Sequence, residues 1–257
     1  MAHREQLAAA PVMPCHPGPA TPPVSDAPGA VPPEAANHGA LEDVIHRMRT
    51  LDSHWPARDG VAVFNRIYLL VTEEIARRIA AGEFPDRRSA TTLDVIFARR
   101  YLTAVDLASA GGRPPACWRP LFQYRRHPGI RPTQFALAGI NAHIGYDLAF
   151  AVLDTCRVLE CGPSDIEPDF DRVGDVLTLM EERIRDDLMP GPDLLEIADP
   201  LTHLVGAWSL DRAREGAWSA ARLLWGVRNL PELSREFDER MDAGVGLVGR
   251  CLLTPWR

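Results

Sequence analysis

One stretch of the chain, residues 134–153, is apolar almost all the way round and is long enough for several helical turns. A helix without a polar face belongs inside a protein, because other helices must cover it on every side. The stretch therefore predicts an all-α fold built around one buried central helix. We expect the helices that carry Phe97 and Trp218 to be among those that pack against it.

The chain from residue 41 onward keeps a helical periodicity, with no strand-like alternation and no internal repeat. We expect Pro132 to open the central helix, which should end near Gly162, and Ser209 to cap a later helix. We place the start of another helix at the Thr91-Thr92 pair, because threonine oxygens are good helix caps. The 257 residues suffice for one large domain, and we predict a single helical bundle over residues 39–257.

Residues 1–38 differ in composition from the rest of the chain. They hold nine of the 23 prolines and few large apolar side chains. Such a segment cannot bury enough apolar surface to offset the entropy that it would lose on ordering. We therefore predict a disordered, proline-rich tail ahead of the helical domain.

Charge and cysteine content argue against several classes of protein. The net charge of −7 disfavours nucleic acid as the main partner. The five cysteines form no Cys-x-x-Cys pair, which is typical of a reduced, intracellular protein. The N-terminus lacks the apolar core of a signal peptide, and polar residues interrupt the one long apolar stretch. We expect a cytoplasmic protein without a transmembrane segment.

The central stretch contains three polar residues, Asn141, His143 and Asp147, which we take as the core of a catalytic site with Tyr101 as a further donor. Burying such groups is costly unless they are paired or bind something. His143 and Asp147 lie four residues apart, on one face of a helix, where they can share a ligand. An imidazole and a carboxylate are good ligands for zinc or another divalent ion. The alternative is a hydrogen-bonded pair that only stabilises the core.

Three further acidic residues are candidate ligands for a divalent metal cofactor, Mg²⁺ or Zn²⁺. Asp94 is either a third ligand or an ordinary charge in the first turn of its helix. Asp175, Thr178 and Glu182 have the spacing of the second magnesium motif of class I terpene synthases, to which this segment is similar. Gly174 stands where that motif usually begins with Asn or Asp, and the first motif is missing, so we favour a chance match in an acidic helix over a magnesium site.

Basic and aromatic residues supply candidates for substrate binding. The Arg99-Arg100 pair could hold a phosphate, because guanidinium groups pair bidentately with phosphate oxygens. Trp118, Tyr146 and Trp218 are candidates to line the apolar part of a pocket. The expected partner is a small apolar or phosphorylated molecule.

Several motifs together resemble an actinobacterial family of domains of unknown function. They are Phe64-Asn-Arg-Ile-Tyr, Leu93-Asp-Val-Ile-Phe-Ala-Arg-Arg-Tyr-Leu, Trp118-Arg-Pro-Leu-Phe, Asn141-Ala-His-Ile-Gly-Tyr-Asp-Leu, Ala217-Trp with Leu224-Trp, and Leu252-Leu-Thr-Pro. The likeness covers about residues 41–256. It implies a helical fold and no established activity.

A second, local likeness concerns the central stretch alone. His143-x-x-x-Asp147 is similar to a ligand pair of the zinc-dependent phospholipases C, although the segment Leu148-Ala-Phe-Ala that follows does not continue that pattern. Three interpretations remain open: a metal-dependent lyase or cyclase for an apolar, isoprenoid or lipid-like substrate, a hydrolase of the phospholipase C type, and a helical binding protein without activity. We favour the first.

Overall fold

Every regular element in the described part of the chain is a helix, which confirms the all-α class. The computed structural model describes residues 33–188 and 209–255, with side chains described in 39–180 and 209–255. These residues belong to one unit, Pro32–Arg257. The elements are α1 (Pro33–His54), α2 (Gly60–Ala80), α3 (Arg87–Ser109), α4 (Arg119–Tyr124), α5 (Pro132–Ala142), η1 (His143–Asp147), α6 (Leu148–Leu159), α7 (Pro163–Leu188), α9 (Leu210–Gly226) and α10 (Pro231–Leu252).

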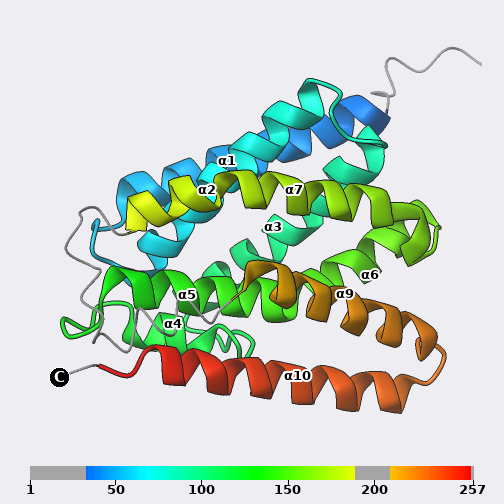
Figure 1. Cartoon of the computed structure of the whole chain (residues 1–257). Coiled ribbons are helices and arrows are strands. Elements are labelled where there is room, and N and C mark those ends of the chain that lie inside the picture. Colours follow the sequence, from blue (N-terminus) through cyan, green and yellow to red (C-terminus); the bar gives the residue numbers. More distant parts are fainter. Residues whose placement is uncertain (1–32, 189–208, 256–257) are drawn as a thin grey trace, which may run out of the picture. The chain divides into compact units, whose positions relative to one another are not determined.

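The predicted central helix consists of α5, η1 and α6, which follow one another without a loop (Figure 1). Its first part packs against α2 and α10, and its last part packs against α3 and α9. Because α3 carries Phe97 and α9 carries Trp218, the expected neighbours are confirmed. Residues 132–159 are long and apolar enough to cross a membrane by length and composition alone, but 78% of that apolar window is buried inside the protein.

Side-chain caps fix where the helices begin. Ser209 accepts a hydrogen bond from the Arg212 amide, as predicted, and Asp86 accepts bonds from two amides at the start of α3. The predicted start of α3 at Thr91 and Thr92 is therefore wrong. Both threonines are buried inside the helix, where their hydroxyls donate to carbonyls one turn earlier.

The N-terminal boundary also differs from the prediction. Helix α1 begins at Pro33, so residues 33–38, which we had assigned to the tail, are helical. A proline suits the first position of a helix because the amide hydrogen that it lacks has no partner there. Residues 1–32 lie outside the described part of the chain, and the expected disorder there stays a prediction.

Two glycines bring α2 and α5 close together. A Cβ atom at Gly139 would lie 2.3 Å from the ring of Phe64, and one at Gly60 would lie 2.3 Å from the ring of Phe135. Real Cβ atoms do not approach other atoms so closely, so each aromatic ring occupies the space that a glycine leaves free. This contact sets the position of α2 beside the polar residues of the central helix.

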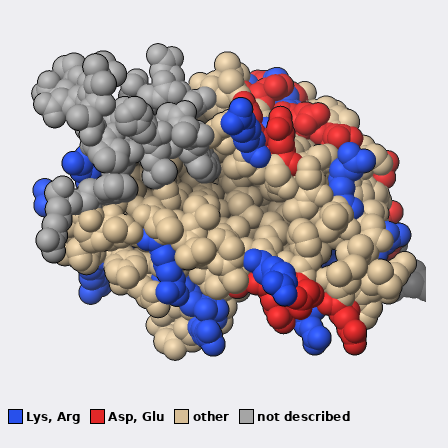
Figure 2. All heavy atoms as spheres, turned by 60° about the horizontal axis from the view of Figure 1, so that its bottom comes forward, with Lys and Arg blue, Asp and Glu red and all other residues tan. Residues whose placement is uncertain are grey.

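Charged side chains lie mainly around the margins of the face drawn in Figure 2, and its centre consists of residues that are neither basic nor acidic. Arginines and acidic residues lie side by side on the right of this view. This interspersed pattern is ordinary for a chain with a net charge of −7. The expectation that nucleic acid is not a partner stays a prediction.

Candidate functional site

The central helix changes its hydrogen-bond pattern at the predicted site. From His143 to Asp147 it forms a π-helical turn, in which the Leu148 amide donates to the His143 carbonyl five residues earlier. Such single turns are rare and occur frequently at functional sites. The sequence predicted one uninterrupted helix here, so the turn is a finding of the structure.

His143 and Asp147 bind each other inside the core. His143 Nδ1 lies 3.0 Å from Asp147 Oδ2, and the same oxygen accepts a hydrogen bond of 2.9 Å from Trp118 Nε1. Because the carboxylate oxygen accepts, Nδ1 carries the ring proton and Nε2 keeps its lone pair. The geometry therefore gives a histidine of fixed orientation and tautomer.

The other ring nitrogen of His143 is buried and has no hydrogen-bond partner among the described residues. The ring is stacked on Phe97, with centroids 3.6 Å apart, and Tyr68 meets it edge-on at 4.3 Å. Burial lowers the pKa of His143, and the bond and charge of Asp147 offset part of this effect. The imidazole is therefore neutral near neutral pH, with its free lone pair at Nε2.

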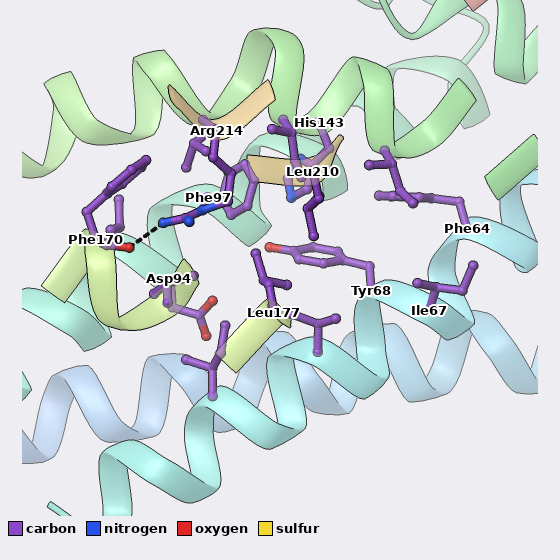
Figure 3. A pocket seen from close by; sticks show the side chains of 17 residues that line it. Phe64, Ile67, Tyr68, Asp94, Phe97, His143, Phe170, Leu177, Leu210 and Arg214 are labelled. Atoms are coloured by element: carbon purple, nitrogen blue, oxygen red, sulfur yellow. Dashed lines mark hydrogen bonds between the residues drawn. The ribbon is translucent and has the colours of Figure 1, made fainter. Parts of the chain in front are cut away.

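His143 lines a partly open cavity of about 80 Å³, called the internal cavity below, to which α2, α3, the central helix, α7 and α9 contribute residues (Figure 3). Apolar atoms form almost all of its surface, although some of the lining residues also carry buried polar groups. A cavity of this size exceeds what one water molecule needs and is smaller than one known to hold benzene, which is about 150 Å³. It suits a small molecule or a small part of a larger one.

Asp94 and Tyr68 bring two more polar groups to this cavity, and both are buried. Asp94 Oδ2 has no partner in the described part of the chain, and burial raises the pKa of Asp94 from 3.8 to about 7. The Tyr68 hydroxyl has no hydrogen-bond partner among the described residues either. Burial, and next the charge of Asp94, raises the pKa of Tyr68 well above its ordinary value.

Arg214 adds a cation to the same cavity. Only 7% of this residue is exposed. One terminal nitrogen, Nη2, donates to the Phe170 carbonyl at 2.5 Å, and Nε has no partner among the described residues. Its guanidinium lies 4.6 Å from the centre of the Phe170 ring. Burial lowers the pKa of Arg214, and acidic residues of α7 and α9 offset part of that effect.

Two predicted catalytic residues, Asn141 and Tyr101, and two predicted substrate-binding residues, Trp118 and Trp218, are absent from the lining of this cavity and connect helices instead. Asn141 Nδ2 donates to the Val245 carbonyl of α10 at 3.0 Å. The Tyr101 hydroxyl donates to Asn65 Oδ1 at 3.2 Å inside the core. Trp118 is fully buried, and its Nε1 donates the hydrogen bond to Asp147 described above. Trp218 Nε1 donates to Glu167 on α7 at 3.1 Å.

Several predicted substrate-binding residues lie at a second, more open cleft. Arg99, Arg100, Tyr146 and Asp147 line this cleft, whose volume is about 320 Å³. Arg100 is paired with Asp154 at 2.6 Å, and the Tyr146 hydroxyl donates to Asp238 on α10 at 2.7 Å. The His143–Asp147 pair thus stands between the internal cavity, which His143 lines, and this cleft, which Asp147 lines.

The predicted metal ligands are brought together only in part. Asp94 and His143 line the same cavity. The side chain of Asp175 is 66% exposed and pairs with Arg172, and the side chain of Glu182 lies outside the described residues. Among the described side chains, no three His, Cys, Asp or Glu residues are grouped so that they could hold a metal ion. The interpretation of Asp94 as a charge in the first turn of its helix is wrong, because α3 begins seven residues before it.

Arg214 and Tyr68 were not predicted from the sequence as site residues. Both belong to the apolar stripe of a helix, and each brings a polar group to the cavity. Arg214 precedes Ala217 and Ala221 at three- and seven-residue spacing, and these alanines are buried in α9. Tyr68 belongs to the apolar stripe of α2. A charged residue at a stripe position was the signal that could have identified Arg214.

A comparison with protein families gives one match. The family described as "Family of unknown function (DUF5995)" matches residues 41–255, and the chain belongs to this family. The predicted membership in a family of unknown function is thereby confirmed. The description of the family names no activity, and the actinobacterial origin stays a prediction. No curated protein and no solved structure matches the chain.

Proposed function

We propose that this DUF5995 protein is an enzyme that binds a small, largely apolar molecule in the internal cavity and transfers a proton through His143. The observation that carries the proposal is the lone pair of His143 Nε2, which is buried and has no partner among the described residues, on a side chain that lines the cavity. A buried polar group without a partner is costly, and such groups are rare in native proteins unless they serve a purpose.

The surroundings of His143 match those of a general base. A catalytic base works best when a third group fixes its orientation and tautomer, and Asp147 does this through Nδ1. Trp118 Nε1 in turn donates to the same oxygen of the Asp147 carboxylate and helps to hold it in place. The lowered pKa of His143 keeps the imidazole in its basic form at neutral pH.

The lining of the cavity indicates the kind of substrate. Its walls are formed almost entirely by apolar atoms from five helices, and the few polar groups of the lining residues are buried behind that surface. Binding sites for small molecules typically combine an apolar lining with a few polar groups that fix orientation. The volume of about 80 Å³ supports a small molecule, or the small reacting end of a longer apolar one.

Alkylation with 2-bromoacetamide tests the proposal. The Nε2 lone pair attacks the carbon that bears bromine, the N–C bond forms as the C–Br bond breaks, and bromide leaves with the bonding electrons. We expect peptide mass spectrometry to find the label on His143 Nε2. Asp147→Asn should slow this labelling strongly, because the asparagine can donate to Nδ1 and shift the proton to Nε2.

His46 of α1 is the internal control, because it is exposed and does not line the internal cavity. Its labelling should be the same in the wild type and in Asp147→Asn. Nitrogen NMR of the histidine rings provides a second measurement, because it distinguishes a protonated from an unprotonated Nε2. Labelling of His46 without His143 in the wild type, or a protonated Nε2 in the folded protein, would overturn the proposal.

A metal-assisted reaction at the same cavity is a second candidate function. Its support is that Asp94 Oδ2 and His143 Nε2, both without partners among the described residues, are ligand atoms suited to Zn²⁺. Calorimetric titration of chelator-treated protein with Zn²⁺, Mn²⁺ and Mg²⁺ tests it, with Asp94→Asn beside the wild type. Binding that depends on Asp94 supports this candidate, and absence of binding in the wild type excludes it.

A further inference from the structure

We infer that the internal cavity recognises a small carboxylic acid, whose carboxylate pairs with the guanidinium of Arg214 and whose apolar remainder fills the rest of the space. This inference names the substrate class of the proposed enzyme and rests on the same cavity. Two observations carry it: a buried cation without an anionic partner, and a space in the fold that is shaped around that cation.

The first observation is the missing counter-ion. An arginine side chain stays charged in proteins, and a buried charge is costly unless an opposite charge accompanies it. No carboxylate lies within ion-pair distance of Arg214 in the described part of the chain, although Asp211, Asp171 and Asp175 act on it from farther away. The Nε donor is buried and has no partner there. An anionic ligand would supply what these residues do not.

The second observation is the room that α7 leaves for the guanidinium. A Cβ atom at Gly174 would lie 1.9 Å from Arg214 Nη1, so any larger residue at this position would displace the guanidinium. The Phe170 carbonyl and ring hold it from the same helix. In Figure 3 the guanidinium lies between Phe170 and Phe97, at the edge of the cavity. These contacts hold the guanidinium in one defined position, as a binding site requires.

A carboxylate suits the site better than a phosphate. Among the described residues that line the cavity, Arg214 is the one basic side chain other than histidine, and Asp94 lines the same space. A dianionic phosphate would face one guanidinium and the Asp94 carboxyl group, whereas a monoanion needs only one positive charge. The aliphatic and aromatic walls favour an apolar remainder over a hydroxylated one.

Two alkylating reagents of nearly the same size test the inference: bromoacetate, which carries a carboxylate, and the neutral 2-bromoacetamide. The rate of labelling at His143 is divided by the rate at His46 for each reagent, which removes their difference in intrinsic reactivity. We expect the wild type to favour bromoacetate at His143 by about tenfold, the scale of a hydrogen bond to a charged group. Arg214→Met should abolish this preference.

Arg212→Met is the matched control, because Arg212 is an exposed arginine on the same helix. It should keep the preference of the wild type. Equal labelling of His143 by the two reagents in the wild type would overturn the carboxylate inference and leave the proposed base intact. A preference that persists in Arg214→Met would also overturn it.

A binding measurement separates failure of this inference from failure of the proposed function. Isobutyrate should raise the melting temperature of the wild type, whereas isobutyramide should not, and Arg214→Met should lose the difference. An isobutyrate shift in a protein whose His143 resists both reagents would support the carboxylate site and refute the base. Absence of any difference between isobutyrate and isobutyramide in the wild type would refute the carboxylate site.

Discussion

Ionisation of Asp94 should make the free energy of unfolding depend on pH, and Asp94→Asn should remove that dependence. Its carboxyl group is buried, and Oδ2 has no partner among the described residues. Burial raises the pKa of Asp94 from 3.8 to about 7. Asp94→Asn replaces it with a neutral group of the same shape that does not titrate, so the difference between the two proteins isolates the ionisation of this carboxyl.

The sign and size follow from proton linkage. Below the unfolded pKa, both states of the chain hold the proton, and the folded protein carries no penalty. Between that pKa and about 7, the folded state keeps a proton that the unfolded state has lost, so the free energy of unfolding falls as pH rises. At about 1.36 kcal/mol per unit of pKa, the whole effect is about 4 kcal/mol, of which roughly 3 kcal/mol falls between pH 5 and pH 8.

His143 acts in the opposite direction over part of this range. Its pKa is lowered by burial, so its contribution to stability is present above the ordinary histidine pKa and is lost as pH falls toward the folded value. The two slopes partly cancel in the wild type. When the free energy of unfolding of the wild type is subtracted from that of Asp94→Asn at each pH, the contribution of His143 cancels and that of the Asp94 carboxyl remains.

Urea denaturation of both proteins at several pH values measures the effect. The stability advantage of Asp94→Asn over the wild type should grow by roughly 3 kcal/mol from pH 5 to pH 8. Asp175→Asn is the matched control, because its side chain is 66% exposed, and its difference from the wild type should stay nearly flat. A flat difference for Asp94→Asn would mean that the folded carboxyl ionises as readily as the unfolded one, and the burial argument would be wrong.

Three further predictions concern the packing around the site, and urea denaturation checks each of them. Gly139→Ala should lower the free energy of unfolding by about 1–3 kcal/mol because its Cβ would meet the Phe64 ring, whereas Gly216→Ala, with no atom within 4 Å, should raise it by about 0.5–1 kcal/mol. Equal effects would contradict the close approach of α2 and α5. Leu148→Ala should cost about 2–5 kcal/mol because only 5% of the residue is exposed, and a neutral result would place this helix at the surface. Trp118→Phe should cost about 1–3 kcal/mol because a buried carboxylate loses a donor, and an unchanged stability would refute that hydrogen bond.

The fold was predictable because it depends on patterns that repeat over many residues. The continuous apolarity of residues 134–153 required a buried helix, and in the structure α2, α3, α9 and α10 are the main helices that pack against it. Ends of helices depend on single contacts and were less predictable. Thr91 and Thr92 are typical capping residues, yet here their hydroxyls donate to carbonyls within the helix, and the cap is Asp86.

The candidate site was predictable only where polarity interrupts an apolar pattern. His143, Asp147 and Asp94 stood out in this way, and His143 and Asp94 line the cavity. The π-helical turn depends on one altered backbone bond and has no marker in composition. Arg214 falls in the apolar stripe of α9, which gave a signal, but arginine is rarely buried without a partner and the signal was passed over. The stripe predicts burial, whereas the contacts of Arg214 with α7 could not be predicted from periodicity.

The distribution of unpartnered polar atoms connects fold and function. In the described part of the chain, eight buried side-chain nitrogen or oxygen atoms have no hydrogen-bond partner. Four of them belong to Tyr68, Asp94, His143 and Arg214, which all line the internal cavity. If packing alone governed these positions, apolar side chains of similar size would make the fold more stable. Their concentration around one cavity supports the proposed ligand site, and the cost of keeping such groups buried is the reason why Asp94→Asn is expected to raise stability above pH 5.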